Sequence, residues 1–213
     1  MVMLNIHVIT IFPEAFESYL KTSILGKAQK KKLFKINFIN LRDFAGGKHK
    51  QVDDSPYGGG PGMVLKFEPI YKAVKSIKAK SEIILFSASG KKLDSKTVRR
   101  LSKNKNLILI CGRYEGVDER VAQNIADETI SIGNYILSGG ELPALVLIEA
   151  LSRHIPGVLG KKESLEEIKG SYPVFTRPEV VAAKGGRKLR VPKSLLSGDH
   201  EKIREWRRKH SKF

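Results

Sequence analysis

The sequence is poor in cysteine and in long apolar runs, and each scarcity excludes a class of protein. A single cysteine, Cys111, rules out an internal disulfide and any zinc site that needs several cysteines. No apolar run approaches the roughly 18 residues of a membrane-spanning helix. The N-terminus also lacks the layout of a signal peptide. We therefore expect a cytoplasmic protein with no membrane segment.

Negative charge is scarce as well. The chain has 22 Asp+Glu against 39 Lys+Arg, which gives a net charge of +17. Such an excess favours a polyanionic partner, with nucleic acid ahead of an anionic membrane. The 213 residues are 41% hydrophobic, which is enough to bury a core, and the length fits one domain with a small appendage.

Several common ligand-binding motifs are missing. The turn after residue 10 has no G-x-G-x-x-G, which excludes the ordinary dinucleotide fingerprint. Segment 58–62 (GGGPG) is not followed by Gly-Lys-Ser/Thr, so it is not a phosphate-binding P-loop. The five histidines have no metal-ligand spacing, and the sequence predicts no metal site.

Strand and helix patterns alternate through most of the chain, which is typical of an α/β fold with a mostly parallel sheet. We expect strands at 4–10, 33–39, 82–87, 106–111 and 128–132, and helices at 12–16, 23–32, 68–77, 94–103 and 117–125.

Three of these strands end in small-residue turns, at 87–91 (SASGK), 111–116 (CGRYEG) and 131–140 (SIGNYILSGG). Ligands of open α/β sheets bind outside the carboxyl ends of the strands, so the three turns are expected to enclose one pocket. The glycine-rich loop 40–63 is too long for a simple connection and is predicted to be functional.

The third turn leads into an apolar helix at 142–151, which is expected to be buried because nearly every face is apolar. Glycines just before such a helix would leave unpaired N–H groups beside a polar pocket. Composition alone favours a loop–helix junction with a packing role over a ligand site.

After His154 the composition changes, which suggests three parts. We predict an α/β domain at 1–160, a charged linker at 161–175 and a small basic helical domain at 176–213. Segment 183–191 is interpreted as a basic connector. Asp199 is expected to cap a final helix that carries several arginines.

Several ungapped blocks, in the same order, resemble the bacterial tRNA (guanine-N1)-methyltransferase family. They are 11–14 (IFPE), 53–63 (DDSPYGGGPGM), 111–120 (CGRYEGVDER), 131–143 (SIGNYILSGGELP), 155–160 (IPGVLG), 176–179 (TRPE), 195–198 (LLSG) and 203–207 (IREWR). The resemblance covers nearly the whole chain. It implies a homodimeric enzyme of the SPOUT class that uses S-adenosyl-L-methionine and methylates the guanosine 3′ of the anticodon, position 37 of tRNA. It also implies a trefoil-knotted cofactor site, which the sequence pattern itself would not have suggested because knots are rare.

The resemblance also assigns roles to individual residues. The implied cofactor-binding residues are Ser87, Gly90, Gly112, Ile132, Gly133, Asn134, Tyr135, Ile136, Leu137, Gly139, Gly140 and Pro143. Arg153 matches the arginine that acts on the target guanine, and Gly58 and Gly59 lie in the loop associated with tRNA. On the basic last helix, Arg207 and Arg208 are expected to bind tRNA. A divalent-ion dependence, with Mg²⁺ as the ion, is implied without any ligand cluster to hold it.

Three departures from the family pattern affect the chemistry. Asn134 stands where the family usually has Asp, and segment 87–90 (SASG) replaces a Ser-Pro-Gln-Gly turn. The segment that normally carries an aspartate base is shortened here to 166–170 (EEIKG), and no Asp lies between Arg153 and Thr176. We assign the base to Glu167, with Glu166 as the substitute. The alternatives are a knotted ribose 2′-O-methyltransferase and a tRNA-binding protein that has lost catalysis.

Overall fold

A five-stranded parallel sheet with the order β2-β1-β6-β5-β7 forms the framework of the first part of the chain. The strands are β1 (Leu4–Thr10), β2 (Phe34–Asn40), β5 (Glu82–Lys92), β6 (Asn106–Cys111) and β7 (Glu128–Ser131). This computed structural model describes residues 3–160 and 170–211. The predicted α/β class with a mostly parallel sheet is confirmed.

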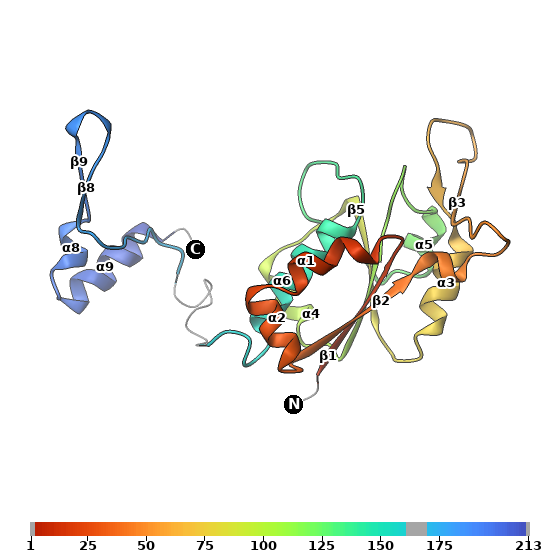
Figure 1. Cartoon of the computed structure of the whole chain (residues 1–213), viewed down its shortest axis with the longest axis horizontal. Coiled ribbons are helices and arrows are strands. Elements are labelled where there is room, and N and C mark those ends of the chain that lie inside the picture. Colours follow the sequence, from red (N-terminus) through yellow and green to blue (C-terminus); the bar gives the residue numbers. More distant parts are fainter. Residues whose placement is uncertain (1–2, 161–169, 212–213) are drawn as a thin grey trace. The chain divides into compact units, whose positions relative to one another are not determined.

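Helices cover both faces of this sheet (Figure 1). They are α1 (Glu17–Leu20), α2 (Ser23–Lys30), α3 (Phe67–Ser76), α4 (Ser95–Leu101), α5 (Glu119–Asn124) and α6 (Glu141–His154), with 3-10 turns η1 (Pro13–Phe16) and η2 (Leu41–Phe44). The ten predicted elements each have a counterpart, and their ends differ by a few residues.

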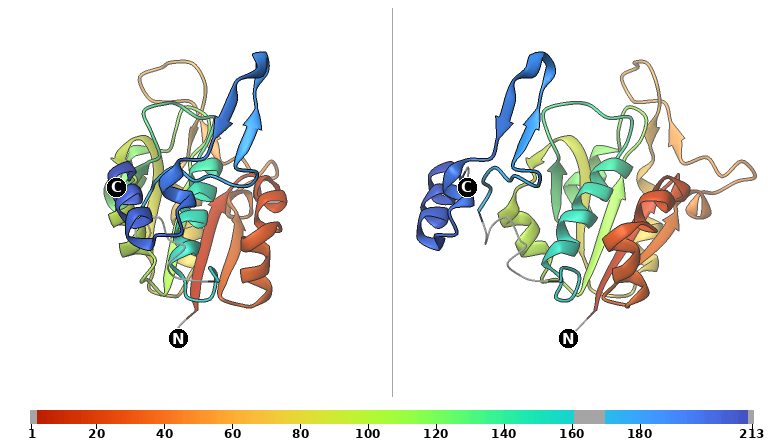
Figure 2. Two further views of the ribbon diagram at one scale, coloured as in Figure 1. Left: turned by 90° about the vertical axis from the view of Figure 1, so that its left-hand side faces the viewer. Right: turned by 60° about the vertical axis from the view of Figure 1, so that its left-hand side comes forward.

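Strand β6 shows how the strand sequence divides the core between the two faces. Leu107 and Leu109 point into the cluster under α1, α2, α4 and α6, whereas Ile108 and Ile110 point into the cluster under α3 and α5. A strand buried on both faces is apolar at nearly every position, because successive side chains alternate between faces. The result is a three-layer unit, seen from two further sides in Figure 2.

Helix α6 is less buried than predicted. Leu142 is 57% exposed and Val146 is 45% exposed, while Leu147, Ile148 and Leu151 are fully buried. The two exposed residues are four apart, so they lie on one face of the helix. The expectation of a helix buried all round is therefore wrong for this face.

The loop between β2 and α3 contains two short strands, β3 (Asp53–Asp54) and β4 (Val64–Leu65), which pair antiparallel. The pairing closes segment 55–63 into a projecting loop. Tyr57 in this loop is fully exposed, and Gly58, Gly59 and Gly62 all have positive φ. Glycine adopts that backbone conformation without strain.

The chain divides into two compact units, Met1–Leu159 and Gly160–Phe213. In the second unit, β8 (Val180–Ala182) and β9 (Lys188–Arg190) form a hairpin through η4 (Lys184–Gly186), followed by α8 (Lys193–Leu196) and α9 (His200–His210). Asp199 caps α9 as predicted, accepting hydrogen bonds from the amides of Glu201 and Lys202 at 3.0 and 3.2 Å. The interpretation of 183–191 as a connector is wrong, since most of it belongs to the hairpin.

No helix within the described parts of the chain is long and apolar enough to cross a membrane.

Candidate active site

Strands β6, β5 and β7 are neighbours in the sheet, and segments toward their carboxyl ends surround one cavity of about 500 Å³. The pocket is lined by residues 85–89 within β5, residues 112–117 after β6, and most of the segment from Thr129 to Gly140 around the end of β7, together with Glu119, Ala122 and Pro143. The three predicted turns therefore meet at one place, because parallel strands share their carboxyl edge.

Ten of the twelve residues implied to bind a cofactor line this pocket: Ser87, Gly112, Ile132, Gly133, Tyr135, Ile136, Leu137, Gly139, Gly140 and Pro143. Gly90 and Asn134 are not among the lining residues. Whether the ten bind a cofactor stays a prediction.

Gly90 has a packing role in this structure. A Cβ atom at Gly90 would come within 2.7 Å of backbone atoms of Thr129 and Ile130. The register of β5 against β7 also breaks between Phe86 and Lys91, so segment 87–90 bulges out of the sheet and returns to it. Gly90 allows that return because only a residue without a side chain fits against β7.

The loop after β6 is held by backbone hydrogen bonds to the segment around β4. The amide of Glu115 donates to the Met63 carbonyl at 2.9 Å, and the amide of Leu65 donates to the Gly116 carbonyl at 3.0 Å. The Glu115 side chain lies against Gly62, where any added Cβ would overlap it. The pocket wall and the loop at 55–63 are thus joined, although they are far apart in the sequence.

A buried ionic cluster fixes the first turn of α6 against the strand ends. Glu141 is only 3% exposed. Its carboxylate accepts a hydrogen bond from Thr10 Oγ1 at 2.8 Å and another from Arg113 Nε at 2.9 Å. The Arg113 guanidinium also lies over the Phe12 ring, 4.7 Å from its centroid. A carboxylate at the start of a helix is stabilised by the helix dipole.

Backbone packing explains Gly140. Its amide donates to the Gly112 carbonyl at 2.8 Å, and a Cβ there would lie 2.6 Å from Cys111 Cα. Burial and the nearby Glu141 carboxylate raise the pKa of the Cys111 thiol, so this cysteine stays protonated.

The loop after β7 presents apolar side chains to the pocket. Ile136 is 82% exposed, and the exposed Tyr135 donates from its hydroxyl to the Ile132 carbonyl at 3.3 Å. Ser131 Oγ lies 2.9 Å from the Gly133 carbonyl oxygen and bridges the turn. Exposed apolar side chains of this kind suit the flat face of a heteroaromatic ring.

Two carboxylates in the pocket were missed by the sequence reasoning. Glu115 and Glu119 both line the cavity, and Arg113 is the one cation among its described lining residues. The signal was available, because both glutamates lie in the block at 111–120 that carries the resemblance. Among the described residues, no group of three or more His, Cys, Asp or Glu side chains could hold a metal ion.

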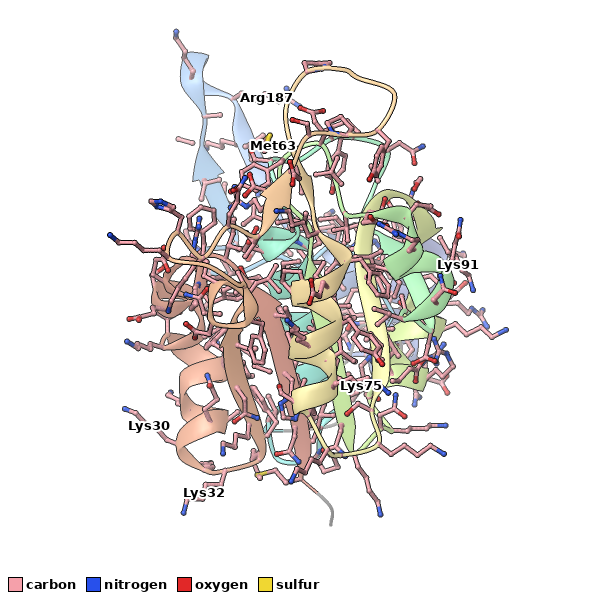
Figure 3. The ribbon with its side chains drawn as sticks, turned by 90° about the vertical axis from the view of Figure 1, so that its right-hand side faces the viewer. Lys30, Lys32, Met63, Lys75, Lys91 and Arg187 are labelled. Carbon is pink, nitrogen blue, oxygen red and sulfur yellow. The ribbon has the colours of Figure 1, made fainter. Side chains whose placement is uncertain are left out.

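Within the first unit, the residues predicted to act on the tRNA do not line this pocket. Arg153 is in the last turn of α6, whereas the pocket surrounds the first turn of the same helix. Arg153 follows Glu141 by 12 positions, which corresponds to roughly 18 Å along a helix axis. Gly58 and Gly59 lie in the loop at 55–63, and Figure 3 labels Met63 at the end of that segment.

The remaining predicted residues belong to the second unit. Arg207 and Arg208 are on α9, where the Arg207 guanidinium lies 5.0 Å from the centre of the Tyr172 ring. Glu166 and Glu167 lie outside the described residues.

Comparisons with known proteins agree with one another. The family model "tRNA (Guanine-1)-methyltransferase TrmD" matches residues 4–213. Proteins named tRNA (guanine-N(1)-)-methyltransferase are 52% identical over 98% of this chain and 85% of the relative in Dictyoglomus turgidum, and 48% identical over 97% and 85% in Haemophilus influenzae strain PittGG. The crystal structure of the tRNA (m1G37) methyltransferase from Aquifex aeolicus superposes with a TM-score of 0.80 at 44% identity, over 98% of this chain and 89% of the other.

Proposed function

Because the chain belongs to the tRNA (guanine-1)-methyltransferase family, we propose that it transfers a methyl group to N1 of guanosine 37 in tRNA. The methyl donor we propose is S-adenosyl-L-methionine, bound in the pocket at the ends of β5, β6 and β7. The observation that carries this assignment is the meeting of three strand-end loops around one cavity of about 500 Å³. Sites for molecules of this size are typically 300–1,000 Å³.

The residues that line the pocket suit this cofactor in both apolar surface and charge. Ile132, Ile136 and Leu137 offer apolar surface to the adenine, while the backbone of the same loop can pair with its polar edge. Glu115 and Glu119 place negative charge in a pocket that would receive a sulfonium and an ammonium group. When bound, the cofactor supplies a methyl group that a nitrogen nucleophile can accept.

The chain must also remove the proton that guanine N1 carries at neutral pH. A carboxylate can take this proton, and a nearby cation can stabilise the negative charge that develops on O6. We assign these roles to Glu167 and Arg153. Arg153 would otherwise be a cation that stabilises the end of α6.

The position of Arg153 supports a site built from two copies of the chain. Arg153 lies at the opposite end of α6 from the pocket of its own chain. The exposed face of α6, which carries Leu142 and Val146, continues toward Arg153 at helical spacing. A second copy packed on this face would bury the two apolar side chains and bring Arg153 close to the partner's pocket. We therefore propose a homodimer.

Methylation of transcribed tRNA tests the function directly. A tRNA transcript with guanosine at position 37 should yield 1-methylguanosine, detected by mass spectrometry of the nucleosides, in a reaction that needs S-adenosyl-L-methionine. The same transcript with adenosine at position 37 is the control. Methylation of a ribose, or cofactor-independent binding without transfer, would contradict the proposal.

Complementation tests the shared site. Arg153→Ala and Gly133→Val chains should each be inactive, and co-expressed heterodimers should regain part of the activity, because one of their two sites has neither substitution. Heterodimers without activity, formed from folded parents, would show that both residues serve the same chain's site.

The trefoil knot and the Mg²⁺ dependence implied by the resemblance remain predictions. A tRNA-modifying enzyme works where tRNA is found, and we propose the cytoplasm as its location.

A further inference from the structure

The β8–β9 hairpin concentrates positive charge without neutralising it. Four of the seven residues from Lys184 to Arg190 are cations: Lys184, Arg187, Lys188 and Arg190. None of these four forms an ion pair with any described residue. Like charges this close repel one another, so the hairpin is less stable than a neutral one would be.

Helix α9 in the same unit is different. Lys202 pairs with Asp199 at 3.2 Å, Lys209 pairs with Glu205 at 2.9 Å, and Arg204 lies 3.9 Å from Glu201. These are pairs between residues three or four apart on one helix. Much of the charge on α9 is therefore balanced within the helix, whereas the charge on the hairpin is not.

The geometry of the hairpin presents this charge outward. Lys188 pairs with Ala182 and Arg190 with Val180, which places both cations on one face, roughly 7 Å apart. Val181 and Leu189 share the other face. At the tip, Gly185 and Gly186 both have positive φ, which allows the tight turn between Lys184 and Arg187.

No third strand supports this ribbon in the described part of the second unit, and each residue of β9 is exposed. Within that unit, the hairpin extends away from α8 and α9 (Figures 1 and 2). Figure 3 labels Arg187 near its outer part. An isolated two-stranded hairpin is only marginally stable in water, so a ligand that neutralises its charge would stabilise it.

We propose that the β8–β9 hairpin is a contact surface for the phosphate backbone of RNA, in addition to α9. The proposal rests on the proposed function, because that function makes tRNA the polyanion that the chain meets. Lysine and arginine are the residues that most often bind phosphate oxygens, and such contacts position a protein without reading sequence. The shallow minor groove of an RNA helix, bordered by phosphates, is open to a narrow ribbon.

The salt dependence of tRNA binding tests this surface without turnover. For Lys188→Gln combined with Arg190→Gln, the slope of log K against log salt concentration should become shallower by roughly 1.4–1.8, since each of the two lost phosphate contacts contributes about 0.7–0.9. The matched control is Lys202→Gln combined with Lys209→Gln on α9. It removes the same net charge from the same unit, but from side chains that are already paired. The slope of the control should change by less than about 0.5.

The possible outcomes distinguish a failure of the hairpin proposal from a failure of the proposed function. Equal changes in the two double variants would mean that only net charge matters, and an unchanged slope in the hairpin variant would mean that it does not touch RNA. Either result overturns the proposal. With a folded hairpin variant, KM for tRNA should rise while kcat and the affinity for S-adenosyl-L-methionine stay the same. If the unmodified protein bound tRNA through the hairpin but transferred no methyl group, the proposed function would fail and the hairpin contact would stand.

Discussion

The two units of this chain are stabilised in different ways. The first unit buries a double-sided core, with side chains such as Phe16 and Leu109 fully enclosed. In the second unit, no residue between 170 and 211 is buried. From residue 160 onward the sequence has 15 Lys+Arg against 7 Asp+Glu. A unit without buried side chains cannot gain much stability from the hydrophobic effect.

This difference indicates a division of work. The first unit holds the geometry of a small-molecule pocket, which requires rigid packing. The second unit presents charged and aromatic side chains that are exposed or only partly buried. The aromatic ring pairs of the second unit, Phe175 with Trp206 and Trp206 with His210, lie near the surface.

The largest expected effect would show that the second unit also takes part in the chemistry. Glu167→Gln should lower kcat by about 10²–10⁴, the usual contribution of a general base. Binding of both tRNA and S-adenosyl-L-methionine should be retained, as measured by calorimetry. Glu166→Gln is the matched control and should have a much smaller effect. If both variants kept full activity, the base would lie elsewhere, and Glu115 and Glu119 of the pocket would be the next candidates.

The next effect tests the stability difference itself. Phe16→Ala removes a fully buried ring and should lower the free energy of unfolding of the first unit by about 3–5 kcal/mol. Trp206→Ala should cost clearly less, because that ring is only partly enclosed. Urea unfolding followed by far-ultraviolet circular dichroism measures both. Equal losses would show that the second unit has a core of its own in solution.

A smaller effect is expected where α6 meets β6. Gly140→Ala places a methyl group 2.6 Å from Cys111 Cα, so the helix or the strand must shift. Overpacking of this kind usually costs about 1–3 kcal/mol. Because the same junction forms the pocket wall, affinity for S-adenosyl-L-methionine should fall as well. Gly59→Ala is the control, since no atom lies within 4 Å of the position its Cβ would take, although its positive φ adds strain. Normal affinity in a folded Gly140→Ala protein would separate this junction from the pocket.

The smallest expected effect concerns the stability of α9 at acidic pH. Hydrogen bonds from backbone amides, chiefly that of Lys202, lower the pKa of Asp199 below its ordinary value. The cap therefore stabilises α9 above about pH 4 and loses this contribution as the pH falls through the lowered pKa. Trp206 is the only tryptophan, so its fluorescence reports on the second unit. The change in Trp206 fluorescence on acidification should be smaller in Asp199→Asn than in the unmodified protein. Some transition should remain, because the pKa of Glu205, paired with Lys209, is lowered too. An identical transition in the variant would show that the cap does not hold α9.

The sequence predicted the sheet and its helices well because those signals are local. Strand β6 is apolar at successive positions, and Asp199 precedes an obvious helix. The hairpin at Val180–Arg190 was missed because each of its strands has only three residues and two of the three residues of β9 are cations, which masks the usual alternation.

Long-range contacts limited the prediction of the site. The sequence places Glu141 at a helix start, but nothing local indicates that Thr10 and Arg113 will reach it. Gly90 was assigned to a ligand because it follows a strand, although the structure places it against β7. Exposure of Leu142 and Val146 depends on which face of α6 meets the sheet, and an all-apolar helix does not reveal that.

The bulge in β5 affects how a ligand would be bound. Segment 87–90 leaves β7 after Phe86 and rejoins it at Lys91, so one neighbouring strand holds both of its ends. Folding therefore already restricts the conformational freedom of this segment, and a ligand that contacts it loses little further entropy. Segment 55–63, held at its base by the short β3–β4 pair, has glycines that keep more freedom until something binds. The affinity for a small molecule should therefore depend mainly on how well its shape fits segment 87–90. The selectivity for a large molecule should depend on whether that molecule orders segment 55–63.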